Sequence, residues 1–361
     1  MRFLTQILNR RFSSALYITG DKAKDHFALL TPHIDFEDQL ENATKLETSI
    51  RLRELKIDLN KIKRRWYFFK HLSEQKHHLD LTRQEISSQI SESQKKGENP
   101  EKLILHRNIV KEDLKILKHY LYGVEESVML SILSLPNFLH DNTKNEEQII
   151  YQHLEKPKHT SNSHMEIGKN LIKFVNPFFY FLKSEAALFE YSLINYASDA
   201  LTPFTPFSNS DFCRSIVVEG CGTDFNDKTE IFTLQNDSDD DNELSRTHLT
   251  GGGSLYSFMS YFTKHIILEN KLPLRFFTTG RRYRPSAGDG NNLLNVNQES
   301  VLEFFLATKD DDQEMNNEFS EVISKIIKIY EPLGYHFRLV YVPAKKFRKL
   351  RKFTCFHSIV F

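Results

Sequence analysis

The sequence predicts an α+β protein in which a long antiparallel helical hairpin precedes a domain of mixed helices and strands. Residues 35–135 contain only two glycines and one proline, and their apolar residues recur at helical spacing. After residue 165 the chain instead alternates between helical and β-like segments. Hydrophobic residues make up 40% of the 361 residues, which is enough for a substantial core.

Within residues 35–135, one signal separates two helical stretches. The segment Lys95–Pro100 (KKGENP) combines Gly97, suited to end a helix, with Pro100, suited to the first turn of the next one. Two helices joined by so short a turn must lie antiparallel. Helices of about 35 to 40 residues would reach roughly 50 to 60 Å, so the hairpin is predicted to form an arm.

The predicted arm carries a basic surplus. Residues 51–118 hold 17 Lys and Arg against 10 Asp and Glu, although the whole chain balances at 48 of each. An extended basic surface is typical of binding to a phosphate backbone, and a solvated coiled-coil surface of mixed charge is the alternative. The residues predicted to contact RNA are Lys61, Lys63, Arg64, Arg65, Lys111, Lys115 and Lys118.

The first twenty residues have the composition of a mitochondrial presequence. They carry Arg2, Arg10 and Arg11, and no acidic residue precedes Asp21. Their apolar residues would share one face of a short helix. We therefore expect residues 1–20 to direct the chain to the mitochondrial matrix, to be removed there and to take no part in the fold.

Other features of the composition argue against several classes of protein. Cys213, Cys221 and Cys355 form neither a CxxC pair nor a zinc-finger spacing, which fits a reducing compartment without a disulfide framework. No apolar run reaches the roughly 18 to 20 residues of a membrane helix, so no membrane insertion is expected. No metal site is predicted, because the three adjacent acids at 310–312 cannot all face one ion.

Residues 136–165 are predicted to form a connector, and residues 166–361 a second domain. Helices are predicted near 183–199, 253–269 and 315–331, and β-like segments at 215–219, 231–234, 275–279, 300–307 and 337–342. No Walker A motif, GxGxxG after a strand, HExxH or nucleophile elbow is present. The glycine-rich Gly251–Ser254 lacks the lysine of a phosphate loop and is predicted to form a tight turn.

Several strings occur in an order that is specific for one family. They are Leu135-Pro136-Asn137 with His140, His164–Gly168, Leu182–Leu193, Pro206 followed by Glu219–Gly222, Leu272–Gly290 and Leu333–Arg338. In this order they resemble mitochondrial seryl-tRNA synthetases, from the connector through motifs 1 and 2 to the strand before motif 3. The resemblance implies a class II antiparallel sheet, flanked by helices, behind a tRNA-binding arm. It also implies dimerisation through the motif 1 region, with Leu182, Leu188, Pro206 and Cys221 at the interface.

The departures from the family concern the groups that bind ATP and serine. Arg284 and Glu303 match family residues, but the glutamate after the motif 2 arginine is replaced by Ser286, and a second basic position by Asn295. The family's Thr-x-Glu string, whose carboxylate pairs with the ammonium group of serine, is matched here by Gly252-Gly253-Ser254. Since a buried ammonium without its carboxylate costs several kcal/mol, specific serine binding is expected to be lost.

Motif 3, which bears an arginine that clamps ATP in the family, has no match before Phe361. A natural loss and a sequence incomplete after about residue 348 are both open explanations. Together the losses resemble one group within the family, the seryl-tRNA-synthetase-like insect mitochondrial proteins, which are non-aminoacylating paralogues.

That resemblance implies a protein with no catalytic residues and no ATP cofactor. It further implies that the chain binds mitochondrial tRNA, with serine tRNA expected. Its partner would be a second copy, or the active mitochondrial seryl-tRNA synthetase in a heterodimer. A divergent but active serine–tRNA ligase and a protein-binding scaffold or regulator are the alternatives.

Overall fold

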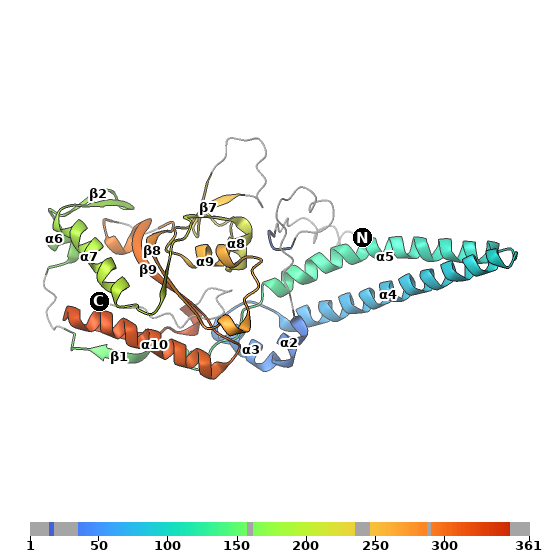
Figure 1. Ribbon diagram of the computed structural model, residues 1–361, viewed down its shortest axis with the longest axis horizontal. Helices are drawn as coiled ribbons and strands as arrows, with labels where there is room; N and C mark the ends of the chain where they lie inside the picture. Colours follow the sequence, from blue (N-terminus) through green and yellow to red (C-terminus); the bar gives the residue numbers. More distant parts are fainter. Residues whose placement is uncertain (1–13, 18–34, 157–161, 235–245, 287–289, 347–361) are drawn as a thin grey trace. The chain divides into compact units, whose positions relative to one another are not determined.

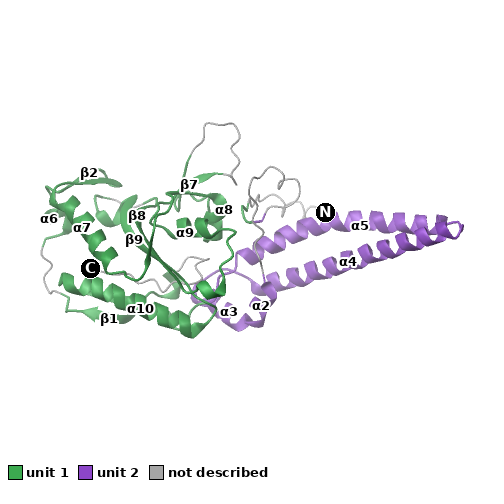
Figure 2. Ribbon diagram, viewed as in Figure 1, with its two compact units in different colours: residues 1–16, 139–361 green, residues 17–138 purple. Residues whose placement is uncertain are grey.

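The computed structural model describes residues 14–17, 35–156, 162–234, 246–286 and 290–346 (Figure 1). The chain divides into two compact units, with residues 17–138 in unit 2 and residues 1–16 and 139–361 in unit 1 (Figure 2). The division falls inside the predicted connector. In the described ranges, no helix is long and apolar enough to cross a membrane.

In its described residues, unit 2 contains two short helices followed by two long ones. They are α2 (Phe36–Glu41), α3 (Ala43–Leu52), α4 (Leu59–Lys95) and α5 (Glu101–Leu133). The Asp58 side chain accepts a hydrogen bond from the backbone N–H of Lys61 and so caps the start of α4. Beyond α4, Gly97 adopts a φ of +72°, where glycine is favoured, and Pro100 immediately precedes α5. The predicted hairpin is therefore confirmed, with helices of 37 and 33 residues.

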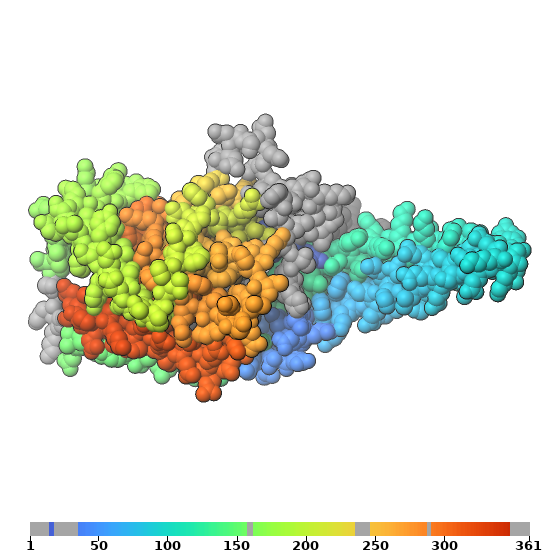
Figure 3. Space-filling view, viewed as in Figure 1, coloured from blue at the N-terminus to red at the C-terminus, as the bar shows by residue number. Residues whose placement is uncertain are grey.

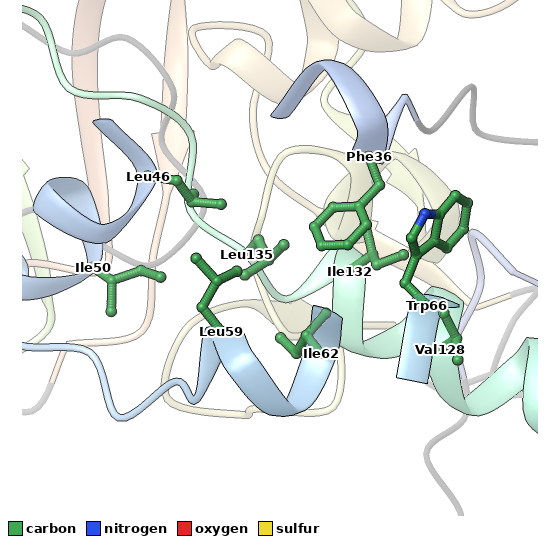
Figure 4. Packing of buried hydrophobic residues seen from close by; sticks show 9 residues of the cluster. All are labelled: Phe36, Leu46, Ile50, Leu59, Ile62, Trp66, Val128, Ile132 and Leu135. Carbon is green, nitrogen blue, oxygen red and sulfur yellow. The ribbon is translucent and has the colours of Figure 1, made fainter. Parts of the chain in front are cut away.

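The base of the hairpin is held by one apolar cluster (Figure 4). Phe36 from α2 packs edge-on against Trp66 from α4, with ring centroids 5.5 Å apart. Val128 and Ile132 from α5 complete the same cluster, and all four side chains are buried. Trp66 is thus a packing residue, as its helical spacing predicts. A smaller cluster farther along the hairpin joins α4 to α5 through Ile86, Ile90, Val110 and Leu114.

The part of unit 1 that the structure describes contains five α-helices and four small sheets. Its helices are α6 (His164–Ile167), α7 (Glu185–Asp199), α8 (Ser215–Gly220), α9 (Leu255–Phe262) and α10 (Asp312–Tyr330), with 3-10 turns at Glu269–Lys271, Leu293–Asn295, Glu331–Leu333 and Ala344–Lys346. Its strands are β1 (Gln148–His153), β2 (Ile172–Asn176), β3 (Phe179–Leu182), β4 (Thr205–Phe207), β5 (Phe212–Arg214), β6 (Phe232–Thr233), β7 (Thr247–Leu249), β8 (Leu274–Tyr283), β9 (Gln298–Ala307) and β10 (Phe337–Tyr341). The sheet orders are β1-β10, β2-β3, β4-β8-β9 and β5-β7-β6.

The β4-β8-β9 sheet organises unit 1. β8 and β9 pair antiparallel over their full length, from Leu274 opposite Ala307 to Tyr283 opposite Gln298. One face of the sheet packs on α10 through Phe277 and Val322. On that face the Arg275 guanidinium forms a paired hydrogen bond with the Glu318 carboxylate of α10. The opposite face therefore remains for α9 and for the candidate site.

Two expectations need correction. Ser215–Glu219 was predicted as a strand from its Ile and Val content, but it lies in α8, where Ile216 and Val218 are buried. Tertiary burial overrides the strand preference of these side chains, because that preference depends on context. The helix predicted near 253–269 ends at Phe262, since Thr263 leaves the helical conformation. The predicted antiparallel pairing is present in β8-β9, and β4 adds to it in parallel.

Candidate functional site

The free face of the β8-β9 sheet gathers two arginines and two glutamates. Arg282 lies opposite Glu299 in the register, and its Nε donates a hydrogen bond of 2.8 Å to the Glu299 carboxylate. The terminal nitrogen Nη1 of the same guanidinium lies 3.7 Å from Glu303 Oε2. Arg282 is therefore the centre of the cluster, although the motif comparison does not identify it as a candidate site residue.

Arg284, the counterpart of the family's phosphate-binding arginine, takes part in the same cluster. Its Nε lies 3.6 Å from Glu299 Oε1, and its Nη2 donates a 3.4 Å hydrogen bond to the Leu294 carbonyl. Two arginines and two glutamates leave this face without surplus positive charge. A triphosphate needs such a surplus, so the pairing favours a structural role for Arg284.

The glycine-rich loop Gly251–Gly253 lies directly on β8. A Cβ atom on Gly251 would meet the Arg281 carbonyl oxygen at 2.0 Å, and one on Gly253 would meet Val301 Cγ2 at 2.4 Å. The Gly253 N–H donates to the Arg281 carbonyl at 3.0 Å, which brings the two backbones together. Only glycine fits this approach at Gly251 and Gly253, so the loop occupies the space beside β8.

The other positions at which the sequence departs from the family take part in local hydrogen bonds and turns. Ser254 immediately precedes α9, is buried, and donates from Oγ to the Gly251 carbonyl at 2.7 Å. The backbone N–H of Gly252 donates to Asp211 Oδ1 at 2.7 Å. The Ser286 N–H donates to Asn297 Oδ1 at 2.9 Å, and Asn295 ends a 3-10 turn. These residues hold the loops around the sheet in place.

On the opposite face, Arg281 joins β8 to α7. Its Nη1 lies 3.4 Å from Glu190 Oε1, and the same carboxylate accepts a 2.6 Å hydrogen bond from Ser300. No sequence pattern predicts this contact, because Glu190 and Ser300 lie 110 positions apart. The alternation of Arg281 and Arg282 between the faces could have been read from the strand period.

Ser215 and His248 form a buried pair. Ser215 Oγ lies 2.9 Å from His248 Nε2, and Thr233 Oγ1 lies 3.1 Å from His248 Nδ1. Both paired residues are fully buried, and burial lowers the pKa of His248 to about 4. The imidazole is therefore neutral near pH 7 and is closed off from substrate, so the pair joins β7 to α8 and β6.

The basic residues near the base of the hairpin differ in their surroundings. Lys61 and Arg64 are exposed, and no ion pair to them occurs among the described residues. Lys63 Nζ lies 3.9 Å from Glu47, while Arg65 donates a 3.4 Å hydrogen bond across the hairpin to Ser131. Lys61 and Arg64 are therefore the members of this group that are most available to a ligand.

The second predicted group lies elsewhere on the arm. Lys111 is exposed, Lys118 is half-buried, and Lys115 lies 4.0 Å from Glu112. Lys118 and Lys111 are roughly 15 and 25 Å along α5 from Val128, which packs at the base. The structure thus separates the seven predicted residues into a group at the base and a group farther out.

A third surface of the arm is apolar. Leu105, Ile109, Ile116 and Tyr120 of α5 are between 53% and 65% exposed. At 3.6 residues per turn they lie within about 60° of one another around the helix. Residues 111, 115 and 118 lie on a different side. We call these four residues the α5 apolar stripe.

A further exposed apolar surface lies on unit 1, where β2, β3 and α7 are drawn in green (Figure 3). Phe179 and Phe181 of the β2-β3 hairpin are 51% and 60% exposed, and Leu188 and Phe189 of α7 are 65% and 61% exposed. Exposed apolar residues in this density are typical of a protein interface. Of the residues predicted for the dimer interface, Leu188 and Pro206 are exposed, while Leu182 and Cys221 are half-buried.

Several predictions concern residues that the structure does not describe. Most of the predicted presequence (residues 1–13 and 18–20) and the chain after residue 346, including Cys355, lie outside the described residues. Within the described ranges, no group of three or more His, Cys, Asp or Glu side chains could hold a metal ion.

Comparison with known sequences gives consistent relatives. The serine–tRNA synthetase-like protein Slimp of Drosophila melanogaster is 29% identical over 349 residues, covering 92% of this chain and 73% of its own. The mitochondrial serine–tRNA ligase of Mus musculus is 24% identical over 368 residues, covering 93% of this chain and 69% of its own. No protein-family model matches the sequence.

Solved structures agree in fold. The seryl-tRNA synthetase from Pyrococcus horikoshii, complexed with ATP, superposes with a TM-score of 0.73 at 18% identity, over 87% of this chain and 77% of its own. The cytoplasmic serine–tRNA ligase from Naegleria fowleri, in complex with AMP, gives 0.71 at 17% identity, over 87% and 75%. The class II synthetase-like fold predicted from the motifs is confirmed, as is the resemblance to seryl-tRNA synthetases.

Proposed function

We propose that this chain, a relative of the seryl-tRNA synthetases, is a mitochondrial paralogue that binds tRNA without charging it. The observation that carries the proposal is the close packing at Gly252 and Ser254, the positions matched to the family's serine-binding string: an added Cβ at Gly252 would lie 3.0 Å from the Asn209 carbonyl oxygen, and Ser254 is buried. Catalysis requires groups that bind the transition state more tightly than the substrates, and here those groups are missing or paired.

The loss of ATP binding follows from the charge on the same face. Arg284 contacts Glu299, and Arg282 contacts both Glu299 and Glu303. A phosphate would have to displace these carboxylates without a surplus of positive charge to receive it. We therefore propose that the protein uses no ATP cofactor.

The basic side chains of the arm support the tRNA-binding part of the proposal. Lys61, Arg64 and Lys111 are exposed on α4 and α5. Such residues contribute affinity for phosphates in general, whereas the choice of RNA depends on contacts with bases or shape. Serine tRNA is the proposed ligand, because the chain is similar to serine–tRNA ligases.

The apolar surface of β2, β3 and α7 supports an assembly. We propose that this surface packs against the equivalent surface of a partner chain, which is either a second copy or the active mitochondrial seryl-tRNA synthetase. Leu188 would be among the residues buried in that interface. The mitochondrial matrix is the proposed location, on the strength of the presequence-like N-terminus and a mitochondrial relative.

A paired assay on purified protein tests the proposal. Serine-dependent exchange between ATP and pyrophosphate is expected to stay at background. Binding to mitochondrial serine tRNA is expected to weaken steeply between two salt concentrations, because phosphate contacts release counterions. Exchange above background would favour the alternative of a divergent but active ligase, and the absence of tRNA binding would reject the RNA-binding role.

The α5 apolar stripe favours a second candidate function, the binding of another protein. Self-association is disfavoured, because an antiparallel pairing that places Ile109 opposite Ile116 also brings Glu112 opposite Asp113 in both copies. An amphipathic helix with basic residues at its centre would fit instead.

A photo-crosslinking side chain separates the two surfaces of α5. In mitochondria, crosslinks from position 116 are expected to reach a protein, and those from position 118 to reach RNA. The protein crosslink should disappear in Ile109→Gln, which removes apolar contact area without weakening the helix. RNA crosslinks from both positions would reject a separate protein-binding surface.

A further inference from the structure

The side chain of Glu219, near the end of α8, binds a segment that lies 203 to 205 positions away in the sequence. Ser14 Oγ donates a 2.7 Å hydrogen bond to Glu219 Oε1. The backbone N–H groups of Ala15 and Leu16 donate to Glu219 Oε2 at 2.5 and 3.1 Å. One carboxylate thus receives three donors from three consecutive residues.

The same segment is buried against unit 1. Ser14 is 6% exposed and Ala15 is 2% exposed. The Leu16 side chain lies against Gly220, where an added Cβ would be 3.7 Å from Leu16 Cδ2. The Leu16 N–H also contacts Ser14 Oγ at 3.2 Å, which fixes the segment in a local turn. Burial and hydrogen bonding therefore act on the same three residues.

Glu219 needs these donors. Its carboxylate is partly buried, and that burial raises its pKa, while the hydrogen bonds from Ser14, Ala15 and Leu16 act in the opposite direction. Removal of all twenty residues of the predicted presequence would strip these three donors from a partly desolvated carboxylate. Such a loss is unfavourable, because water would have to replace three well-placed donors at a carboxylate that is only partly accessible.

We propose that Ser14–Leu16 stays in the mature protein as a strap bound by Glu219, and that presequence removal stops before Ser14. The processing part of this inference rests on the proposed mitochondrial location. The strap itself rests only on the contacts with Glu219. Glu219 is then a binding site for a peptide segment that presents a serine hydroxyl and two successive backbone N–H groups.

A thermal-denaturation cycle tests the strap. In a chain that begins at Ser14, Glu219→Gln is expected to lower the melting temperature by about 4 °C or more, because an amide replaces one acceptor oxygen with a donor. In a chain that begins at Tyr17, the same substitution should change it by less than about 1 °C. Glu146→Gln, at an exposed acid of the same unit, serves as the matched control in both chains.

The cycle is paired with the mapping of the mature N-terminus of the full chain by intact mass after import into mitochondria. Equal effects of Glu219→Gln in both chains would overturn the strap. A mature chain that begins after Leu16 would overturn its retention. A chain that is not imported, while the cycle still shows coupling, would overturn the mitochondrial location and leave the strap supported.

Discussion

We expect the affinity for serine tRNA to fall by about two to three orders of magnitude near 0.1 M salt when glutamine replaces all four of Lys61, Arg64, Lys111 and Lys118. Among the residues that the structure describes, these four have neither an ion pair, as Lys63 and Lys115 have, nor a hydrogen bond across the hairpin, as Arg65 has. Glutamine keeps the helix propensity, so the arm should stay folded. The plot of log affinity against log salt should also become shallower by about three to four units.

A second quadruple variant controls for the loss of charge. Lys169, Lys173, Lys228 and Lys271 are exposed on unit 1, and their replacement with glutamine changes the net charge by the same amount. Filter binding or fluorescence anisotropy at several salt concentrations measures both variants. If the two lose affinity equally, the basic residues of the arm are not the tRNA contact.

Replacing Trp66 with alanine is expected to destabilise unit 2 by about 3 to 5 kcal/mol. The indole is 9% exposed and packs between Phe36 and Phe69, so its removal leaves a cavity where α2 meets α4. Denaturant unfolding followed by far-ultraviolet circular dichroism measures the change. Since Trp66 is the one tryptophan of the chain, its fluorescence reports unit 2 in the unmodified protein.

Two neighbouring substitutions test the reason for this loss. Trp66→Phe is expected to cost less than about 1.5 kcal/mol, because the ring contacts largely remain and the indole N–H has no hydrogen-bond partner within the described ranges. Tyr67→Ala, at a side chain 60% exposed, is expected to cost less than about 0.5 kcal/mol. A similar loss for Trp66→Ala and Tyr67→Ala would show that helix propensity, and not core packing, sets the stability of the base.

Helical periodicity predicts the long elements of this protein well, because each period is local to a few turns. The hairpin turn follows from Gly97 and Pro100, and the buried position of Trp66 follows from the helical spacing of its apolar neighbours. The helix at Ser215–Gly220 could not be predicted in this way, because burial of Ile216 and Val218 against distant segments decides its conformation. The short helices α2 and α3 lie inside the range predicted as the hairpin, because their apolar residues continue the same helical spacing.

At the candidate site, the sequence identified the missing groups but not their replacements. The motif comparison predicts that Arg284 and Glu303 persist and that Gly252 and Ser254 replace the serine-binding side chains. It does not predict that Arg282 and Glu299 neutralise the face, because the pairing depends on the register of two strands about 17 positions apart. The motif comparison also does not predict the close approach of Gly253 to Val301, because that approach depends on how the loop packs on the sheet.

On the proposed loss of aminoacylation, the glycine loop on β8 also limits the mutations by which serine activation could return. A Cβ atom at Gly252, which matches the family's threonine, would lie 3.0 Å from the Asn209 carbonyl oxygen, and a glutamate at position 254 would replace a buried serine that donates to the Gly251 carbonyl. Each single step toward the family's string therefore lowers stability before it gains activity. In evolutionary terms, a return to aminoacylation would require several coordinated changes in this loop and its neighbours.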